Sequence, residues 1–345
     1  MRVRIVAVGF VTASALLCFN ILRPRILSAS LKPDFTSMWA GARALDPYDV
    51  WEITKAQAWI WGGDRPMPFL YPPSSLPLFF PFGLLPFWIA YALWTLASVV
   101  LFWTASKQLT KHPALAFLSP HAVLSLSLGQ TTLITGGATI WAVALLGSRP
   151  VLAGVFLGVG AALKPQCFLL APIALISGRH WKAIGGAALA WSILAIPVLP
   201  LWPDWWRVVQ ALPAILDKDY PIVGAFGATP TYLAKALQLP TVPFQIAGLL
   251  FGAAVVWLSF RTTDNLTRVV GLISGTLIAS PYAVRYELAA LAPAYVAAYM
   301  SGTVRSVIVA IPLLCTNVLT VVPALFVSCV ANFAGQKPQQ EVGKP

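Results

Sequence analysis

Carboxylates are scarce in this chain, so each of them is a candidate for chemistry. The 345 residues include 11 Asp and Glu against 23 Lys and Arg. Asp34 lies between a long apolar run and a Trp-containing stretch that begins at Thr36. A carboxylate held there, at a membrane surface, can act as a general base that takes the proton of a hydroxyl group. Two structural roles compete with this one: Asp34 could cap a helix at Thr36, or pair with Lys32 or Arg43.

The remaining acidic, histidine and cysteine residues favour structural roles. Asp46 belongs to a turn-like sequence, and Asp49 can cap a helix that starts near Trp51. Asp217-Lys218-Asp219 has the spacing of a DxD motif but lies in a late segment that favours a solvated turn. The 3 histidines are not spaced as metal ligands, and the 4 cysteines sit in apolar stretches without a CxxC pair. We therefore expect neither a catalytic metal nor a cofactor.

The elements that must position these groups are apolar helices. Hydrophobic residues make up 58% of the chain and charged residues only 10%, against about 25% charged in a typical soluble domain. Membrane lipids must therefore solvate much of the surface, and the expected fold class is all-α integral membrane. The net charge of +12 is scattered between apolar runs, which argues against a nucleic-acid partner. The expected membrane spans are 3–22, 86–106, 113–128, 131–147, 150–163, 166–178, 182–200, 243–260, 268–281, 287–302 and 305–330.

Charge on the connecting segments sets the expected orientation. If the N-terminus is cytoplasmic, every short cytoplasmic link carries Lys or Arg, as the positive-inside rule requires. The long segments 23–85 and 201–242 then lie outside the cytoplasm. We interpret 3–22 as a retained helix, because a signal peptide has an apolar region of only about 7–15 residues. Residues 1–335 would form one polytopic domain in the inner or plasma membrane, followed by a polar tail, 336–345.

Both external segments are rich in aromatic residues. The first contains two short helix-like stretches, 36–45 and 51–61, the second of which carries Trp51, Trp59 and Trp61. These tryptophans are typical anchors at a membrane interface. The second external segment carries Trp202, Trp205 and Trp206. Those rings either anchor the segment at the interface or stack on a sugar.

Four blocks of sequence follow one another between residues 30 and 300 in an order that is similar to that of a known family. They are Asp34-Phe35 with Trp39-Ala40 and Pro47-Tyr48-Asp49; Phe69-Leu70-Tyr71-Pro72-Pro73 with Leu85-Pro86; Leu128-Gly129-Gln130 with Leu163-Lys164-Pro165 and Arg179-His180-Trp181-Lys182; and Ser280-Pro281-Tyr282. Together they resemble glycosyltransferase family 87, the polyprenyl-phosphate-mannose-dependent mannosyltransferases of the GT-C class. One block departs from the family pattern: many members carry histidines after the Ser-Pro pair, where this chain has Arg285-Tyr286-Glu287.

The resemblance implies a GT-C-type bundle of roughly 10–12 transmembrane helices, with short interfacial helices in the first external loop. It implies transfer of a hexose, typically mannose, from a polyprenyl-phosphate donor to a glycolipid or glycan acceptor at the periplasmic face. The reaction would be an inverting single displacement with Asp34 as general base. Arg285 and then Lys164 are the candidates for binding the donor phosphate. Further candidates for substrate binding are Gln130, Tyr71, Arg43, Tyr282, Tyr286 and Glu287.

Alternatives to these roles and to this function remain open. Arg285 can pair with Glu287 or with lipid headgroups, Lys164 can extend to headgroups, and Gln130 can cap a helix. The chain could also be a transporter or flippase of lipid-linked sugars, or a non-catalytic subunit of a polysaccharide assembly system. Transporters tend to have matching halves and charges near mid-bilayer, whereas here the halves differ and the charges gather at predicted helix ends.

Overall fold

The computed structural model describes residues 32–62, 67–219, 227–301 and 318–333, together with Pro312 and positions 3, 5, 7–9, 11 and 12. Most of the expected first span, 3–22, and the whole polar tail, 336–345, therefore lie outside the described residues. In the described part the chain is helical, apart from one isolated β-bridge between Gly227 and Val284. The all-α class expected from the composition is confirmed.

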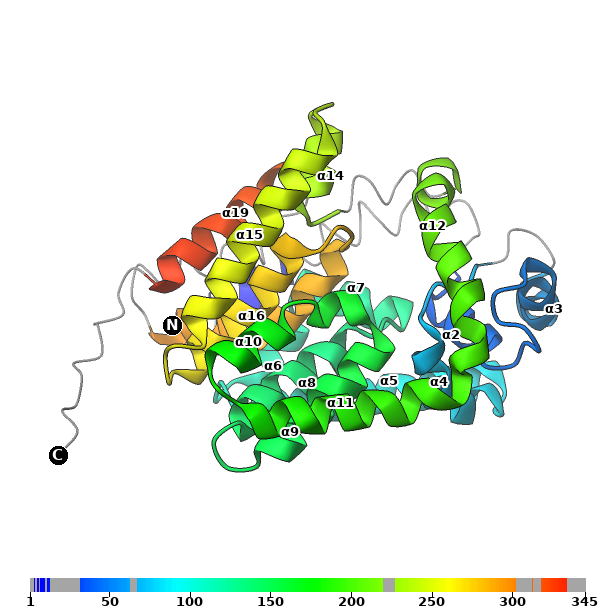
Figure 1. The fold of residues 1–345 in the computed structure, drawn as a ribbon, viewed down its shortest axis with the longest axis horizontal. Helices are drawn as coiled ribbons and strands as arrows, with labels where there is room; N and C mark the ends of the chain where they lie inside the picture. The colour runs from blue at the N-terminus through cyan, green and yellow to red at the C-terminus, as the bar shows by residue number, and fades with distance from the viewer. Residues whose placement is uncertain are drawn as a thin grey trace.

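The helices lie in the order that the apolar runs indicate (Figure 1). Their bounds are α2 Phe35–Gly41, α3 Val50–Trp61, η1 Pro73–Ser75, α4 Leu76–Gly83, α5 Phe87–Ser106, α6 Pro113–Phe117, α7 Pro120–Leu128, α8 Thr132–Leu145, α9 Pro150–Leu163, η2 Pro165–Phe168, α10 Ala171–Ser177, α11 Trp181–Ala195, η3 Ile196–Leu201, α12 Trp202–Asp219, α14 Pro230–Ala236, α15 Thr241–Ser259, α16 Asn265–Ala279, η4 Arg285–Leu291, α17 Ala292–Ser301 and α19 Val318–Phe333.

Three of the described helical stretches are long and apolar enough to cross a bilayer: Phe87–Ser106, Trp181–Ala211 and Thr241–Ser259. Their outward faces carry large apolar side chains, such as Trp88 and Leu250, which are more than half exposed. In water such faces would be costly, whereas in lipid they are solvated. Five shorter apolar helices of 10–17 residues pack beside them, among them α8, α9 and α16. The chain is thus a membrane protein, as its composition indicates.

The structure divides or extends some of the expected spans at proline-containing sequences. The span 113–128 is two helices, because the Ser119 hydroxyl caps a new helix whose first residue is Pro120. The span 182–200 does not end at a turn. It continues through the 3-10 helix η3, with a kink at Val198, into α12. The expected turn at Asp217-Lys218-Asp219 is therefore wrong, because these residues form the end of α12.

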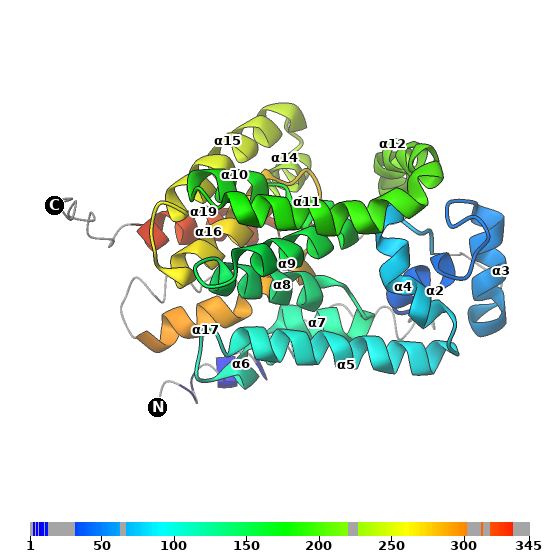
Figure 2. The ribbon, with the colours of Figure 1, turned by 60° about the horizontal axis from the view of Figure 1, so that its bottom comes forward.

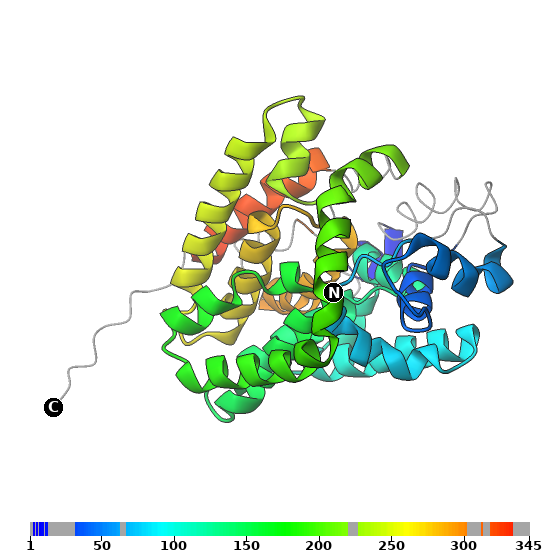
Figure 3. The same cartoon turned by 45° about the vertical axis from the view of Figure 1, so that its right-hand side comes forward.

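The described parts of segments 23–85 and 201–242 approach each other at one end of the molecule. Helices α2, α3 and α4 pack there beside the first turns of α5 (Figures 1 and 2), and α2 and α3 confirm the two short helices expected within 36–61. Helix α12 rises from the end of η3 over this group, as Figure 3 also shows. The indole of Trp205 on α12 donates a hydrogen bond of 3.2 Å to the carbonyl of Leu70. The second segment is therefore tied to the first beside Tyr71.

Helices α9 and α11 pack closely against each other. Gly154 and Gly158 on α9 face α11, where an added Cβ at either position would meet the backbone of Ala183 or Ala187. The glycines therefore let the two helix backbones approach closely, as small residues do between membrane helices. The end of α9, which holds Lys164, is fixed in place by this packing.

Candidate active site

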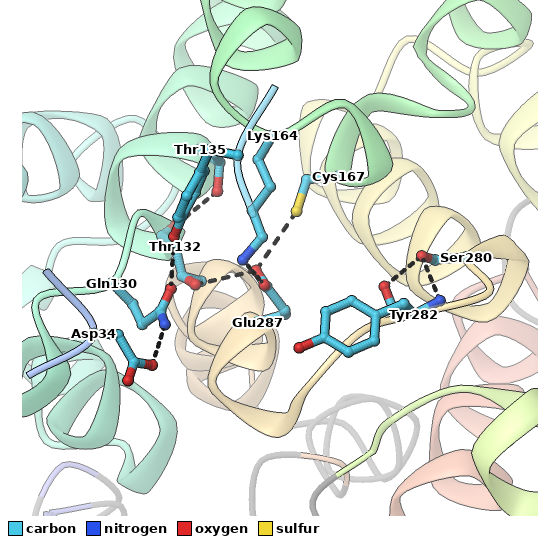
Figure 4. Close-up of polar contacts among 10 residues, drawn as sticks. Asp34, Gln130, Thr132, Thr135, Lys164, Cys167, Ser280, Tyr282 and Glu287 are labelled. Atoms are coloured by element: carbon cyan, nitrogen blue, oxygen red, sulfur yellow. Dashed lines mark hydrogen bonds and ion pairs between the residues drawn. The ribbon is translucent and has the colours of Figure 1, made fainter. Parts of the chain in front are cut away.

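Polar side chains from five separate segments meet in one cluster at the helix ends (Figure 4). The segments are the start of α2, the residues before η1, the turn between α7 and α8, the junction of α9 with η2, and the stretch from Ser280 to Glu287. Most of the site residues expected from the sequence lie here: Asp34, Tyr71, Gln130, Lys164, Tyr282, Tyr286 and Glu287.

Asp34 precedes helix α2 but does not cap it with its side chain. The first turn is satisfied instead through the main chain, because the Asp34 carbonyl accepts from the Ser37 amide at 3.1 Å and from the Ser37 hydroxyl at 2.9 Å. The half-buried carboxylate accepts a hydrogen bond from the side-chain amide of Gln130. The capping role that competed with a chemical role for this carboxylate is thus wrong.

Gln130 is aimed at Asp34 by the way helix α7 ends. Gly129 has a left-handed conformation with φ of 64°, which ends the helix and turns the chain toward α8. The Trp94 indole donates to the Gly129 carbonyl at 3.0 Å, and the main-chain N–H of Gln130 donates to the Ser125 carbonyl at 2.9 Å. Gln130 is 5% exposed. The sequence left open whether Gln130 caps a helix or binds a sugar, and in the structure its side chain joins Asp34 to Tyr71.

Tyr71 completes this part of the cluster. Its hydroxyl donates to the Gln130 side-chain carbonyl at 3.3 Å, and its own carbonyl accepts from the Tyr48 hydroxyl at 2.8 Å. Burial raises the pKa of Tyr71 above its ordinary value, and burial likewise raises the pKa of Tyr282 to about 12. Both phenols therefore keep their protons at neutral pH and remain hydrogen-bond donors.

Lys164 and Glu287 form a buried ion pair at the centre of the cluster. The glutamate also accepts a hydrogen bond from the Thr132 hydroxyl at 3.0 Å and a weaker one from the Cys167 thiol at 3.5 Å. Lys164 takes its position because Pro165 cannot continue α9 and the chain turns there. One alternative is thereby wrong: the buried Lys164 pairs with Glu287 and does not extend to lipid headgroups.

The remaining candidates take different places. Arg285 begins η4 with only 4% of its surface exposed, so the expected contact with lipid headgroups is also wrong. The ring of Tyr286 packs over Lys164, with 5.2 Å between the ammonium nitrogen and the ring centroid. Tyr282 points its hydroxyl toward the side of the cluster where Glu287 lies (Figure 4). Arg43 is exposed; it donates to the Gly83 carbonyl at 2.7 Å and so holds α2 against α4.

Sequence reasoning missed two members of the cluster. Thr132 donates to Glu287, and Cys167, for which we expected only a structural role in an apolar stretch, donates to the same carboxylate. Thr132 could have been found, because Gln130-Thr131-Thr132 is a run of polar residues at the start of an apolar helix. Nothing in the spacing of Cys167 indicates its partner.

Electrostatically, the cluster brings the carboxylates of Asp34 and Glu287 together with the ammonium group of Lys164, and Glu287 and Lys164 are buried. Burying a charge is costly, so buried charges are retained when they have a task or a partner. A carboxylate that can accept a proton beside a cation that can stabilise a departing anion is suited to group transfer between an anionic donor and a hydroxyl.

Comparisons with known proteins agree with this chemistry. A family model described as glycosyltransferase family 87 matches residues 69–281, which is more than half of the chain. The matched part includes Tyr71, Gln130 and Lys164, while Asp34 and the stretch from Arg285 to Glu287 lie outside it. No curated protein and no solved structure matches the chain.

Proposed function

The chain belongs to glycosyltransferase family 87, and from that membership we propose that it transfers a hexose, mannose in the first instance, from a polyprenyl-phosphate donor to an acceptor hydroxyl. The family membership and the apolar helices establish that it is a membrane glycosyltransferase. The proposal adds the lipid-linked donor, the outer membrane face and the role of each residue in the cluster.

The single observation that carries the proposal is the direction of the Asp34 carboxylate. It is turned away from the helix that it precedes and toward Gln130, in the cluster that also contains the Lys164–Glu287 pair. A carboxylate used only to start α2 would bond the amides of that helix. Its orientation supports a role toward a substrate that enters the cluster.

The proposed reaction is an inverting single displacement. The acceptor oxygen forms a bond to the anomeric carbon on the face opposite the phosphate, and Asp34 takes the acceptor's proton. The bond between that carbon and the phosphate oxygen breaks, and its electron pair stays on the departing polyprenyl phosphate. The carbon passes through an oxocarbenium-like state, and proton removal by a positioned base contributes about 10²–10⁴-fold to the rate.

Arg285 and Lys164 are the proposed partners of the departing phosphate, which gains negative charge as the bond breaks. Arg285 offers a planar set of donors suited to phosphate oxygens, and it is buried at the start of η4. Lys164 is oriented by Glu287. Tyr71, Tyr282 and Tyr286 are proposed to line the sugar, because their rings and hydroxyl groups can provide both stacking and hydrogen bonds.

The positions of these groups also support a donor that is anchored in the bilayer. Lys164 follows the last turn of the apolar helix α9, and Ser280 to Tyr282 follow the last turn of α16. A phosphate at the ends of such helices can keep its lipid tail beside their apolar sides. With the N-terminus in the cytoplasm, we place this end of the molecule, and segments 23–85 and 201–242, on the periplasmic side.

The test uses the full chain in lipid nanodiscs with polyprenyl phosphate that carries a radiolabelled mannose. We expect label to appear in an added glycolipid or glycan acceptor, and we expect Asp34→Asn and Asp34→Ala to abolish transfer while their thermal unfolding stays close to that of the parent. A glucose-loaded carrier tests the choice of hexose. In proteoliposomes, label that crosses the membrane without a covalent product would identify a transporter and overturn the proposal.

A further inference from the structure

We propose that Gln130 is a positioning residue for the base, and that Tyr71 fixes the direction in which its amide points. The inference rests on the proposed function, because it takes Asp34 as the group that accepts the proton. It goes further by assigning a second residue of the α7–α8 turn to the reaction, acting through Asp34 rather than on the substrate.

The chemistry of the three groups allows one arrangement. An ionised carboxylate only accepts hydrogen bonds, so the Gln130 group that faces Asp34 must be its NH₂. The amide oxygen then faces the other way, toward the Tyr71 hydroxyl at 3.3 Å. A phenol that keeps its proton donates to that oxygen. The flipped amide would place its oxygen against the carboxylate, which cannot donate, so Asp34 excludes that orientation, and Tyr71 holds the other one by donating to the amide oxygen.

This arrangement changes the base in two ways. First, the N–H donor stabilises the charged form of Asp34 over the neutral acid, so the residue stays ionised and able to accept a proton. Second, it restrains the plane of the carboxylate of this half-buried residue at the start of a short helix. Orientation of a reacting group is a large part of what an enzyme contributes to rate.

The backbone around Gln130 is built to hold this position. A Cβ added to Gly129 would lie 2.7 Å from the Tyr91 ring and 2.8 Å from the Cβ of Phe35, the residue next to Asp34. The turn and the start of α2 therefore touch directly. The Tyr91 hydroxyl also donates to the Leu126 carbonyl at 3.0 Å, which fixes the last turn of α7 to α5. The packing of the turn thus holds the side chain of Gln130 against Asp34.

The experiment measures kcat, KM and the pH dependence of kcat/KM for sugar transfer in nanodiscs. For Gln130→Leu we expect kcat to fall about 10–100-fold, a fraction of the contribution of a general base, with little change in KM. The acidic limb of the kcat/KM profile, where activity falls as the pH decreases, should move up by about one pH unit, because the carboxylate loses the donor that favours its charged form. Tyr71→Phe should also lower kcat, but by a smaller factor than Gln130→Leu.

Gln130→Glu is the second variant, and it keeps the shape of the side chain. It places a second carboxylate beside Asp34, so that one of the two pKa values rises strongly. We expect the acidic limb to move further than in Gln130→Leu. This variant keeps the inference testable if the leucine variant folds poorly.

Two controls match the substitutions in chemistry, and the glutamine control also matches in burial. Gln57 is a buried glutamine that donates to and accepts from the backbone of Met67 at 2.8 and 3.0 Å, away from Asp34. Tyr295 is a buried tyrosine whose hydroxyl is paired with Ser328 at 3.2 Å. Gln57→Leu and Tyr295→Phe should lower thermal stability as much as the test variants do and leave the acidic limb where it is.

The outcomes separate this inference from the function on which it rests. If Asp34→Ala still transfers sugar, the proposed function fails. If Asp34→Ala is inactive while folded Gln130→Leu and Gln130→Glu keep the parent's pH profile, the proposed function stands and the positioning role of Gln130 is overturned. A moved limb in both Gln130 variants, absent from both controls, supports the inference.

Discussion

Lys164 and Glu287, which are 123 residues apart in sequence, form an ion pair whose side chains are only 6% and 4% exposed. The pair connects the end of α9 to the 3-10 helix η4, and Thr132 joins it from α8. Removing one partner of such a pair leaves an uncompensated buried charge, which costs about 3–5 kcal/mol. The pair is therefore both a structural link and, in the proposed reaction, the support of a phosphate-binding cation.

A charge reversal separates these two roles. We expect Lys164→Ala and Glu287→Ala each to lower the unfolding temperature markedly and to abolish transfer. The double variant Lys164→Glu with Glu287→Lys should recover much of the stability, because the pair is restored, but not the transfer, because the cation then stands on η4. Thermal unfolding and labelled-sugar transfer are measured on the same preparations. Full recovery of transfer would mean that Lys164 serves only to pair with Glu287.

Arg285 is expected to act mainly on the donor phosphate. Arg285→Lys should keep a cation and lose the planar array of donors, so we expect a fall in kcat/KM of about 10–100-fold, corresponding to the 1.5–3 kcal/mol of a charge-assisted hydrogen bond. Arg285→Ala should lose more. Arg261, which is exposed and packs over the ring of Trp257, is the matched control, and Arg261→Ala should leave the kinetics unchanged. Equal effects of the Arg285 and Arg261 changes would contradict the assignment.

Gly129 is expected to tolerate no side chain. Gly129→Ala would place a Cβ against Phe35 and Tyr91 and in a left-handed backbone, which costs about 1–2 kcal/mol from conformation alone. We expect transfer to fall more than the amount of folded protein, since Gln130 is displaced from Asp34. In contrast, Gly185 lies inside helix α11 with open space around its Cα, so Gly185→Ala should be neutral or stabilising by up to about 1 kcal/mol. Size-exclusion profiles and initial rates report the two effects.

The link between α12 and the segment before η1 can be tested with two neighbouring tryptophans on α12. Trp205 donates to the Leu70 carbonyl, one residue before Tyr71, whereas Trp206 is 54% exposed. We expect Trp205→Ala to reduce transfer several-fold, in proportion to a hydrogen bond of about 0.5–1.5 kcal/mol together with lost packing. Trp206→Ala should have little effect on transfer at equal reconstitution. The reverse order of effects would show that membrane anchoring outweighs the contact with Leu70.

Composition and apolar spacing were sufficient to predict much of the fold. The predicted span 150–163 coincides with α9, and 86–106 and 243–260 differ from α5 and α15 by a few residues, because long apolar runs between charged links leave few alternatives. The division at Ser119-Pro120 was missed although it is encoded locally: Ser is a preferred N-cap and Pro a preferred first helical residue.

The site could be predicted only in part. Asp34 could be selected because carboxylates are rare and this one stands at the end of an apolar run. Its contact with Gln130 spans 96 residues, and the sequence alone does not show which polar residue of α7–α8 faces α2. The pairing of Glu287 with Lys164, 123 residues away, is hidden in the sequence for the same reason. Such contacts depend on how helices pack, and only local patterns are visible in sequence.

The turn from Gly129 to Thr132 carries a consequence for how this protein can change. Gln130 contacts Asp34 and Thr132 contacts Glu287, so one short connection is shared by the proposed base and by the carboxylate that pairs with Lys164. Any substitution that shifts the turn by a fraction of an ångström alters both contacts at once. New sugar or acceptor preferences are therefore more accessible through Tyr282 and its surroundings, where a residue can vary without loosening the two charged groups together.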